Sequence, residues 1–132
     1  MSRSVSMENE EALTPAVLRW AALGTVLQIG WVVAGHYSDA VYALWPVPLL
    51  ATSIVSSAAY VMQVRRSPGD SAWHGGMVGA ICAFLGTALA AVLADVPALD
   101  LAKVTLGGMA LGAATGWLTF AVVRLVSPAR GG

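Results

Sequence analysis

The sequence predicts an all-α integral membrane protein, with four transmembrane helices in a compact bundle and both termini cytoplasmic. Three observations support this prediction. Of the 132 residues, 58% are hydrophobic and 11% are charged, against roughly 25% charged in soluble domains. Four stretches without a formal charge are long enough to cross a bilayer. The Lys and Arg residues also gather on one side of the resulting topology.

The four charge-free stretches occupy most of the chain. They hold 19 residues between Arg19 and Asp39, 25 between Asp39 and Arg65, 20 between His74 and Asp95, and 20 between Lys103 and Arg124. Barrel strands would alternate polar and apolar residues, which these stretches do not, so helices are expected. The approximate helix ranges are 15–36, 41–64, 74–95 and 100–126, within a transmembrane domain over 15–127.

The first predicted helix follows a solvated cytoplasmic tail over 1–14. Thr14 provides an N-cap and Pro15 suits the first helical position. The tail lacks the apolar core of a cleavable signal peptide, and translation starting at Met7 instead of Met1 stays open. Pro46 and Pro48 fall in the first two turns of the second helix, or just before it if that helix begins near Val47.

The remaining boundaries rest on turn-forming residues. Residues 67–70, Ser-Pro-Gly-Asp, predict a turn between the second and third helices. A short link containing Asp95, Pro97 and Asp100 joins the third helix to the fourth, which makes these two helices antiparallel neighbours. Residues 128–132 form a C-terminal tail.

Orientation follows from the basic residues. One side holds Arg3, Arg19, Arg65, Arg66, Arg124 and Arg130, and the other holds only Lys103. By the positive-inside rule, both termini and the central 64–73 loop are cytoplasmic. The chain is therefore expected to be a multi-pass protein of a plasma (bacterial inner) membrane. Arg65, Arg66 and Arg124 either contact anionic lipid headgroups or, as is more common, only fix the topology.

A weak internal repeat connects the two halves. Leu-Gly-Thr at 23–25 recurs at 85–87, and the segment 59–68 resembles 119–128. Each half would be one helical hairpin that starts inside. Chance similarity between apolar helices is the competing explanation.

Glycines at four-residue intervals mark two helix faces. The residues concerned are Gly75, Gly79, Ala83 and Gly86 in the third helix, and Gly108, Gly112 and Gly116 in the fourth. The segment fits neither a Walker loop nor a dinucleotide fingerprint. Small residues at this spacing instead let helix backbones approach closely in lipid. These faces either meet each other or, for part of the surface, meet another chain, and we favour the second outcome.

Gln28 is the most polar residue far from either membrane interface. Its amide needs hydrogen-bond partners there. We expect an interhelical hydrogen bond to Ser53, Ser56, Thr87 or Thr115. The alternative is a polar transport path lined by Gln28, Thr52, Ser53, Ser56 and Thr115.

Few residues suggest a cofactor or a reaction. His36 and His74 are predicted at opposite membrane interfaces, so they cannot share one heme. His36 alone could ligate a pigment or a heme shared with a partner chain, but an interfacial residue bonded to Asp39, Tyr37 or solvent is the simpler expectation. The single cysteine, Cys82, excludes an intramolecular disulfide and a Cys-x-x-Cys metal site. No metal site is expected.

These observations favour a non-enzymatic membrane module. The chain would pack through small-residue faces, as a homo-oligomer or as an accessory subunit of a larger membrane complex. Its partners would be the lipid bilayer and other membrane-embedded chains, and not nucleic acid, because the formal net charge is zero. The alternative is a small oligomeric transporter or channel with a polar path near Gln28.

Overall fold

The computed structural model describes residues 2–64 and 67–127, with side chains described from Pro15 onward. The described chain is helical and contains no strand. Its helices are α1 (Ser2–Tyr37), α2 (Asp39–Tyr42), α3 (Val47–Gln63), α4 (Pro68–Val92) and α5 (Asp100–Val126). The prediction of an all-α fold is confirmed.

Among the described residues, three helical stretches are long and apolar enough to cross a membrane: Pro15–Tyr37, Pro68–Val92 and Asp100–Val126. The remaining apolar helix, α3, has 17 residues, which corresponds to about 25 Å at 1.5 Å per residue. A bilayer core is about 30 Å thick. The chain therefore has the character of a helical membrane protein, with three long apolar helices and one shorter helix.

Helix α1 begins earlier than the sequence predicted. Its backbone is helical from Ser2, so that Pro15 lies inside the helix and not at its first position. Proline inside a helix removes one hydrogen bond and crowds the preceding turn, but α1 continues through Pro15. The segment before it is free of glycine and rich in good helix formers such as Glu10, Glu11 and Ala12. The stretch 2–14, predicted as a tail, thus continues α1.

The predicted helix over 41–64 is interrupted near its start. The four-residue α2 is followed by turns over 43–46, and α3 begins only at Val47. Pro46 precedes α3 and Pro48 occupies its first turn, where a missing N–H costs nothing because the first helical N–H groups have no intrahelical partner. Of the two alternatives for these prolines, the helix start near Val47 is confirmed.

Helix α4 begins six residues before the predicted start, at Pro68. Ser67 caps it, because the Ser67 hydroxyl oxygen accepts a hydrogen bond from the Asp70 N–H at 3.1 Å. The residues expected to form a turn are therefore the first turn of a helix. At the other end, Ala94 adopts φ of 60° and the Asp95 N–H donates to the Ala90 carbonyl at 2.9 Å, as at many helix C-termini. Helix α5 has the predicted bounds.

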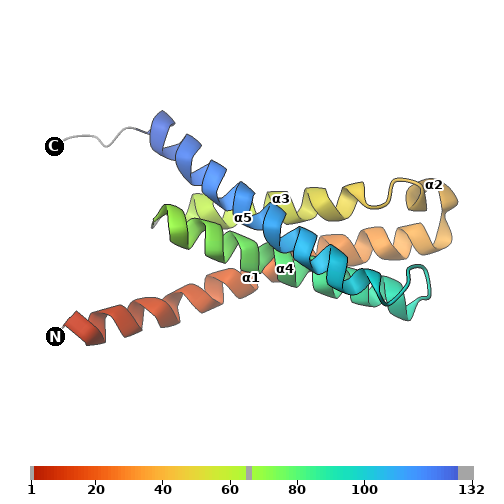
Figure 1. Ribbon diagram of the computed structural model, residues 1–132, viewed down its shortest axis with the longest axis horizontal. Coiled ribbons are helices and arrows are strands. Elements are labelled where there is room, and N and C mark those ends of the chain that lie inside the picture. The colour runs from red at the N-terminus through yellow and green to blue at the C-terminus, as the bar shows by residue number, and fades with distance from the viewer. Residues whose placement is uncertain (1, 65–66, 128–132) are drawn as a thin grey trace.

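Helices α3 and α4 form the centre of the bundle. Each contacts α1, α5 and the other, whereas α1 and α5 do not touch each other in the described part of the chain. The start of α1, the end of α3, the start of α4 and the end of α5 all lie at one end (Figure 1). We call this the termini end. Helix α2 and the link between α4 and α5 lie at the opposite end, which we call the loop end.

The arrangement bears on the proposed repeat. A two-fold exchange of the hairpins α1–α3 and α4–α5 would convert the α3–α4 contact into an α5–α1 contact. Only the first of these contacts exists within the described residues. The repeated Leu-Gly-Thr segments do occupy similar environments, since Gly24, Thr25, Gly86 and Thr87 are all buried. The local likeness is therefore not accompanied by two-fold symmetry of the bundle.

The bundle interior combines apolar side chains such as Tyr60, Leu49 and Val61 with many small and polar ones, while numerous large apolar side chains face outward. Among the residues whose side chains are described, eight polar residues are buried, namely Thr25, Gln28, Thr52, Ser53, Ser56, Ser57, Ser71 and Thr87. Helix α5 is the most peripheral helix, because its buried residues are three glycines. Leu106, Leu118 and Leu125 on its outer side are more than half exposed. Such a distribution suits an apolar solvent around the bundle.

Candidate functional site

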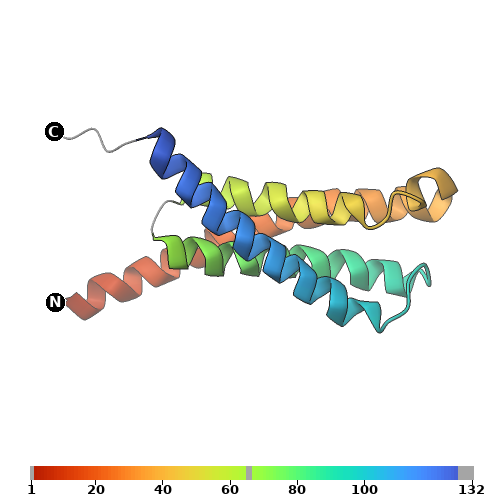
Figure 2. The same ribbon diagram turned by 45° about the horizontal axis from the view of Figure 1, so that its top comes forward.

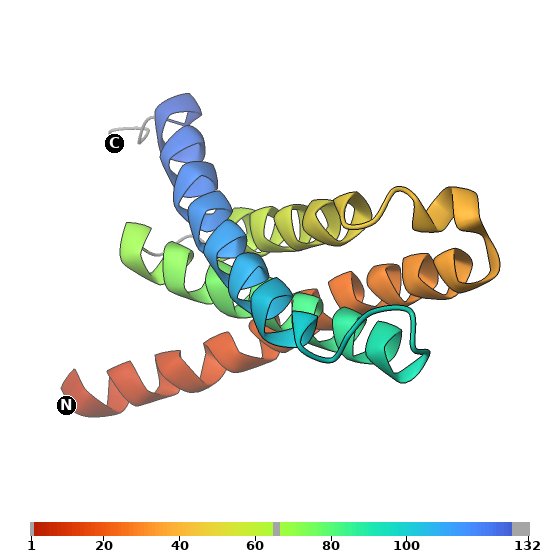
Figure 3. The same ribbon diagram turned by 45° about the vertical axis from the view of Figure 1, so that its right-hand side comes forward.

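Helices α4 and α5 approach each other closely through glycines. A Cβ atom added to Gly75 would lie 2.7 Å from the Gly112 carbonyl oxygen, and one added to Gly108 would lie 2.8 Å from the Gly79 carbonyl oxygen. Both distances are shorter than real Cβ contacts allow. The two glycine faces predicted from the sequence thus lie against each other, at the crossing of α4 and α5 (Figure 3).

The other small residues predicted for helix packing are also engaged within the chain. Ala83 lies against Gly108, and a Cβ on Gly116 would collide with the Ser71 carbonyl oxygen. Gly86 faces a different neighbour, because a Cβ there would meet the Gln28 amide oxygen and the Leu49 side chain. A contact with another chain would therefore have to use surfaces other than these seven residues.

Gln28 of α1 is fully buried where α1 meets α3 and α4. Its amide nitrogen donates to the Leu49 carbonyl at 3.2 Å and to the Ser53 hydroxyl oxygen at 3.4 Å. Ser53 in turn donates its hydroxyl to the Leu49 carbonyl at 3.0 Å, and Thr52 does the same at 2.9 Å. Ser53 is thus the partner among the four considered. The Leu49 carbonyl accepts three side-chain donors, of which Thr52 and Ser53 belong to α3 itself and Gln28 comes from α1.

The residues of the predicted polar path do not form one group. Gln28, Thr52 and Ser53 share the Leu49 carbonyl. Ser56 is buried one turn further along α3, next to Gly24 and Cys82. Thr115 is half-buried on α5, a helix that makes no contact with α1 within the described chain. Four of the five residues therefore lie along the α1–α3 contact, and Thr115 lies apart from it.

Some buried polar atoms near this contact have no hydrogen-bond partner within the described chain. They are the Gln28 amide oxygen and the hydroxyl oxygens of Thr25 and Thr87, with the Ser71 hydroxyl nearer the other end of α4. A buried polar atom without a partner carries a desolvation cost. These atoms mark the places where the interior departs from paired packing.

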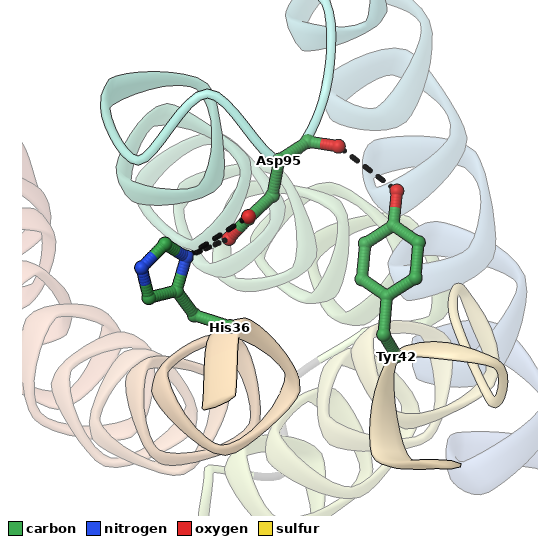
Figure 4. A network of polar contacts seen from close by, with 3 residues as sticks. All are labelled: His36, Tyr42 and Asp95. Carbon is green, nitrogen blue, oxygen red and sulfur yellow. Dashed lines mark hydrogen bonds and ion pairs between the residues drawn. The ribbon is translucent and has the colours of Figure 1, made fainter. Parts of the chain in front are cut away.

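A second polar network holds the two hairpins together at the loop end of the bundle. The His36 Nδ1 atom lies 2.9 Å and 3.1 Å from the two carboxylate oxygens of Asp95, and the Tyr42 hydroxyl donates to the Asp95 backbone carbonyl at 2.9 Å. Figure 4 shows both side chains converging on Asp95 from the first hairpin. The His36 and Asp95 side chains are 34% and 19% exposed.

A small cavity of about 10 Å³ adjoins this network. Its walls include Trp31, Tyr42, Trp45, Leu49 and Asp95. The volume is enough for roughly one water molecule, provided that polar partners are present. Asp95 and Tyr42 carry such groups.

The hydrogen-bond partner of His36 was not among those expected from the sequence. Its Nδ1 partner is Asp95, which is 59 residues away in the sequence, and not Asp39 or solvent. Tyr37 contributes an edge-on ring contact at 5.1 Å. The sequence indicated only that His36 and Asp95 lie on the same, non-cytoplasmic side of the membrane. A pigment or heme ligated by His36 would have to use Nε2, because Nδ1 faces the carboxylate.

The second histidine lies at the termini end, in the first turns of α4. Its Nδ1 atom is 2.8 Å from the Asp70 carbonyl oxygen, and its ring lies 5.9 Å from that of Tyr60. His36 and His74 therefore occupy opposite ends of the bundle. Within the described residues, no group of three or more His, Cys, Asp or Glu side chains could hold a metal ion.

Comparisons of the chain with protein-family models, with curated proteins and with solved structures find no match.

Proposed function

We propose that the chain is a four-span membrane protein without catalytic chemistry, which acts by associating with other membrane-embedded chains. In this proposal α1, α3, α4 and α5 each cross the bilayer of a plasma (bacterial inner) membrane. The start of α1 and the end of α5 lie at the same end of the bundle, which supports an even number of crossings (Figure 1). The basic residues assigned to that end support its cytoplasmic location.

The observation that best supports a packing role is the environment of Gln28. A transport path would require the polar residues of α1 and α3 to face one common cavity. Instead, the Gln28 amide nitrogen and the Ser53 hydroxyl are joined through the Leu49 carbonyl. Polar side chains that bond across a helix contact serve helix association in membranes.

The outer side of α5 is the surface we assign to a partner chain, either a second copy or a subunit of a larger complex. Helix α5 buries only glycines against the rest of the bundle. Leu106, Leu118 and Val122 are 55–67% exposed. Ala110 and Ala114 are also exposed and provide small positions among them.

The test is a mild-detergent purification at native expression, read by native mass spectrometry. We expect masses above that of the monomer for the wild type. Ala114→Trp on the exposed side of α5 should reduce association, whereas Ala34→Trp on the exposed side of α1 should not. A wild-type chain that is monomeric under all conditions would contradict the proposal, as would equal effects of the two variants.

The second candidate function is a small oligomeric transporter or channel. The observation in its favour is that three buried polar oxygens, on Thr25, Gln28 and Thr87, have no hydrogen-bond partner within the described chain. Reconstituted vesicles would then show a solute flux that Gln28→Leu removes. A flux unchanged by that substitution would contradict a path near Gln28.

A further inference from the structure

A groove lies between the start of α4 and the end of α5, at the termini end of the bundle. It has a volume of about 460 Å³ and is lined by Pro68, Trp117, Phe120, Ala121, Arg124 and Leu125. Five of these six residues are apolar, and the sixth is a cation. Binding sites for small molecules typically have 300–1,000 Å³, so the groove is large enough to hold part of a ligand.

The sequence of α5 explains why the groove forms there. Gly108, Gly112 and Gly116 keep α5 against α4, but the next positions on the same face, at intervals of four, are Phe120 and Arg124. Bulky side chains do not allow the same backbone approach. Beyond Gly116 the end of α5 therefore diverges from the start of α4, as the second view of the bundle shows (Figure 2).

Arg124 is the charged group of this groove. It lies two residues before the end of α5, it is exposed, and it has no hydrogen-bond or ion-pair partner within the described chain. Arg19, at the same end, is different. Its guanidinium donates to the Gln63 side chain and lies 5.7 Å from the Trp20 ring centre. The carboxylate of Asp70, in the first turn of α4, accepts a hydrogen bond from the Ser67 hydroxyl at 2.7 Å and is not paired with Arg124.

We propose that this groove binds one anionic phospholipid of the surrounding leaflet, with an acyl chain against Trp117, Phe120 and Ala121 and the phosphate on Arg124. The inference rests on the membrane insertion proposed above, but not on association with other chains. The apolar walls match an acyl chain, and the free guanidinium matches a phosphate, which arginine binds in a bidentate manner. A basic residue at the end of a membrane helix is the usual contact for anionic headgroups.

A second groove supplies a matched control. It has about 380 Å³ and lies between α1 and α3, with Leu27, Trp31, Leu44, Ala51 and Val55 among its lining residues. None of the residues that line it is charged. It is expected to accept acyl chains without selecting a headgroup.

The experiment is a lipid competition on the full chain, purified in mild detergent and read by native mass spectrometry. Equal amounts of phosphatidylglycerol and phosphatidylcholine with the same acyl chains are offered. We expect about fivefold more bound phosphatidylglycerol, the effect of roughly one basic contact. Arg124→Gln should bring the ratio close to one. Lys103→Gln, which removes a cation at the loop end, should leave it unchanged.

A second pair of variants tests the groove itself. Ala121→Trp fills it and should lower phosphatidylglycerol binding several-fold, whereas Ala51→Trp in the control groove should preserve the headgroup ratio. A ratio that survives Arg124→Gln would overturn the proposal. So would binding that survives Ala121→Trp, or an Ala121→Trp variant that converts a dimer to a monomer without losing lipid, since a second copy would then be the occupant.

The two proposals fail in distinguishable ways. Carbonate extraction of membranes that contain the full chain reports insertion separately from lipid selectivity. An inserted chain that binds both lipids equally would overturn the lipid site alone. A chain that carbonate removes from the membrane would overturn the proposal of a membrane-spanning protein, and the lipid site with it.

Discussion

Gly79 of α4 and Gly108 of α5 face each other with no space for a side chain between them. A Cβ atom on Gly108 would lie 2.8 Å from the Gly79 carbonyl oxygen, and it would also collide with the Ala83 methyl group. The neighbouring Gly107 differs, because a Cβ there would meet nothing within 4 Å. Two consecutive glycines of the same helix thus have opposite packing environments, which makes the contact testable with small substitutions.

The first prediction compares Gly108→Ala with Gly107→Ala. We expect Gly108→Ala to lower the free energy of unfolding by about 1–3 kcal/mol, because overpacked backbone contacts force the helices apart. Gly107→Ala should leave stability unchanged or raise it by up to about 1 kcal/mol, through the higher helix propensity of alanine. Denaturant titration in mild detergent, followed by circular dichroism, measures both. Equal shifts would show that α5 does not use its glycine face against α4.

The second prediction concerns the coupling of Gln28 to its neighbours. Gln28→Leu and Ser53→Ala should each destabilise the chain modestly, since interhelical hydrogen bonds in membranes contribute about 0.6–2 kcal/mol. Their combined effect should be smaller than the sum, because both remove one shared bond. Gln28→Leu and Thr115→Val should be additive, since the helix of Thr115 makes no contact with α1 among the described residues.

The control for this cycle is the pair Gln28 and Thr115. The three single variants and two double variants are measured by the same detergent unfolding titration. Coupling between Gln28 and Thr115 as strong as that between Gln28 and Ser53 would contradict the described contacts. It would favour a common polar path through the bundle.

Composition and spacing predicted the helices well, because the length of an apolar stretch depends only on local sequence. Helix α5 has the predicted bounds, between Asp100 and Val126. The starts of α3 and α4 shifted for local reasons that the sequence also contains. Two prolines delay α3 to Val47, and the Ser67 cap brings α4 forward to Pro68.

Which side chains meet could not be predicted in the same way. The four-residue spacing indicated that Gly75 and Gly108 lie on close-packing faces, but not that these faces meet each other. Gln28 had several candidate partners at a similar depth, and only the rotation of α1 relative to α3 selects Ser53. The contact between Asp95 and His36 could be predicted even less, because it depends on how the two hairpins are placed at the loop end of the bundle.

The third prediction is a double-mutant cycle on the pair His36 and Asp95. Replacing both by alanine should reveal a coupling of about 0.2–1 kcal/mol, the usual range for partly exposed charge-assisted pairs. The pair Asp100 and Lys103, which is 3.5 Å apart and more exposed, should give a coupling near zero. Tyr42→Phe should be additive with the loss of the Asp95 carboxylate, because Tyr42 bonds to the backbone carbonyl.

Salt provides the check on this cycle. At a pH at which the imidazole is protonated, the His36–Asp95 coupling should decrease between low ionic strength and about 1 M salt, where the screening length falls to roughly 3 Å. Unfolding titrations at the two salt concentrations measure the change. A coupling of zero at low salt would mean that the two hairpins are not joined by this contact in detergent.

The last prediction concerns the membrane topology. Single cysteines at Asp39, Gly69 and Ala98, all exposed positions, report the side of each connection. With four crossings, a membrane-impermeant maleimide added to intact cells should label Asp39→Cys and Ala98→Cys. Gly69→Cys should react only after the membrane is permeabilised, because α3 must cross between it and Asp39. The native Cys82 is buried, so the unmodified chain should remain unlabelled and serve as the control.

The decisive position is Gly69, because α3 is the shortest of the four helices proposed to cross the membrane. If α3 did not cross, Gly69→Cys would share the outer side with Asp39→Cys, and Ala98→Cys would be protected.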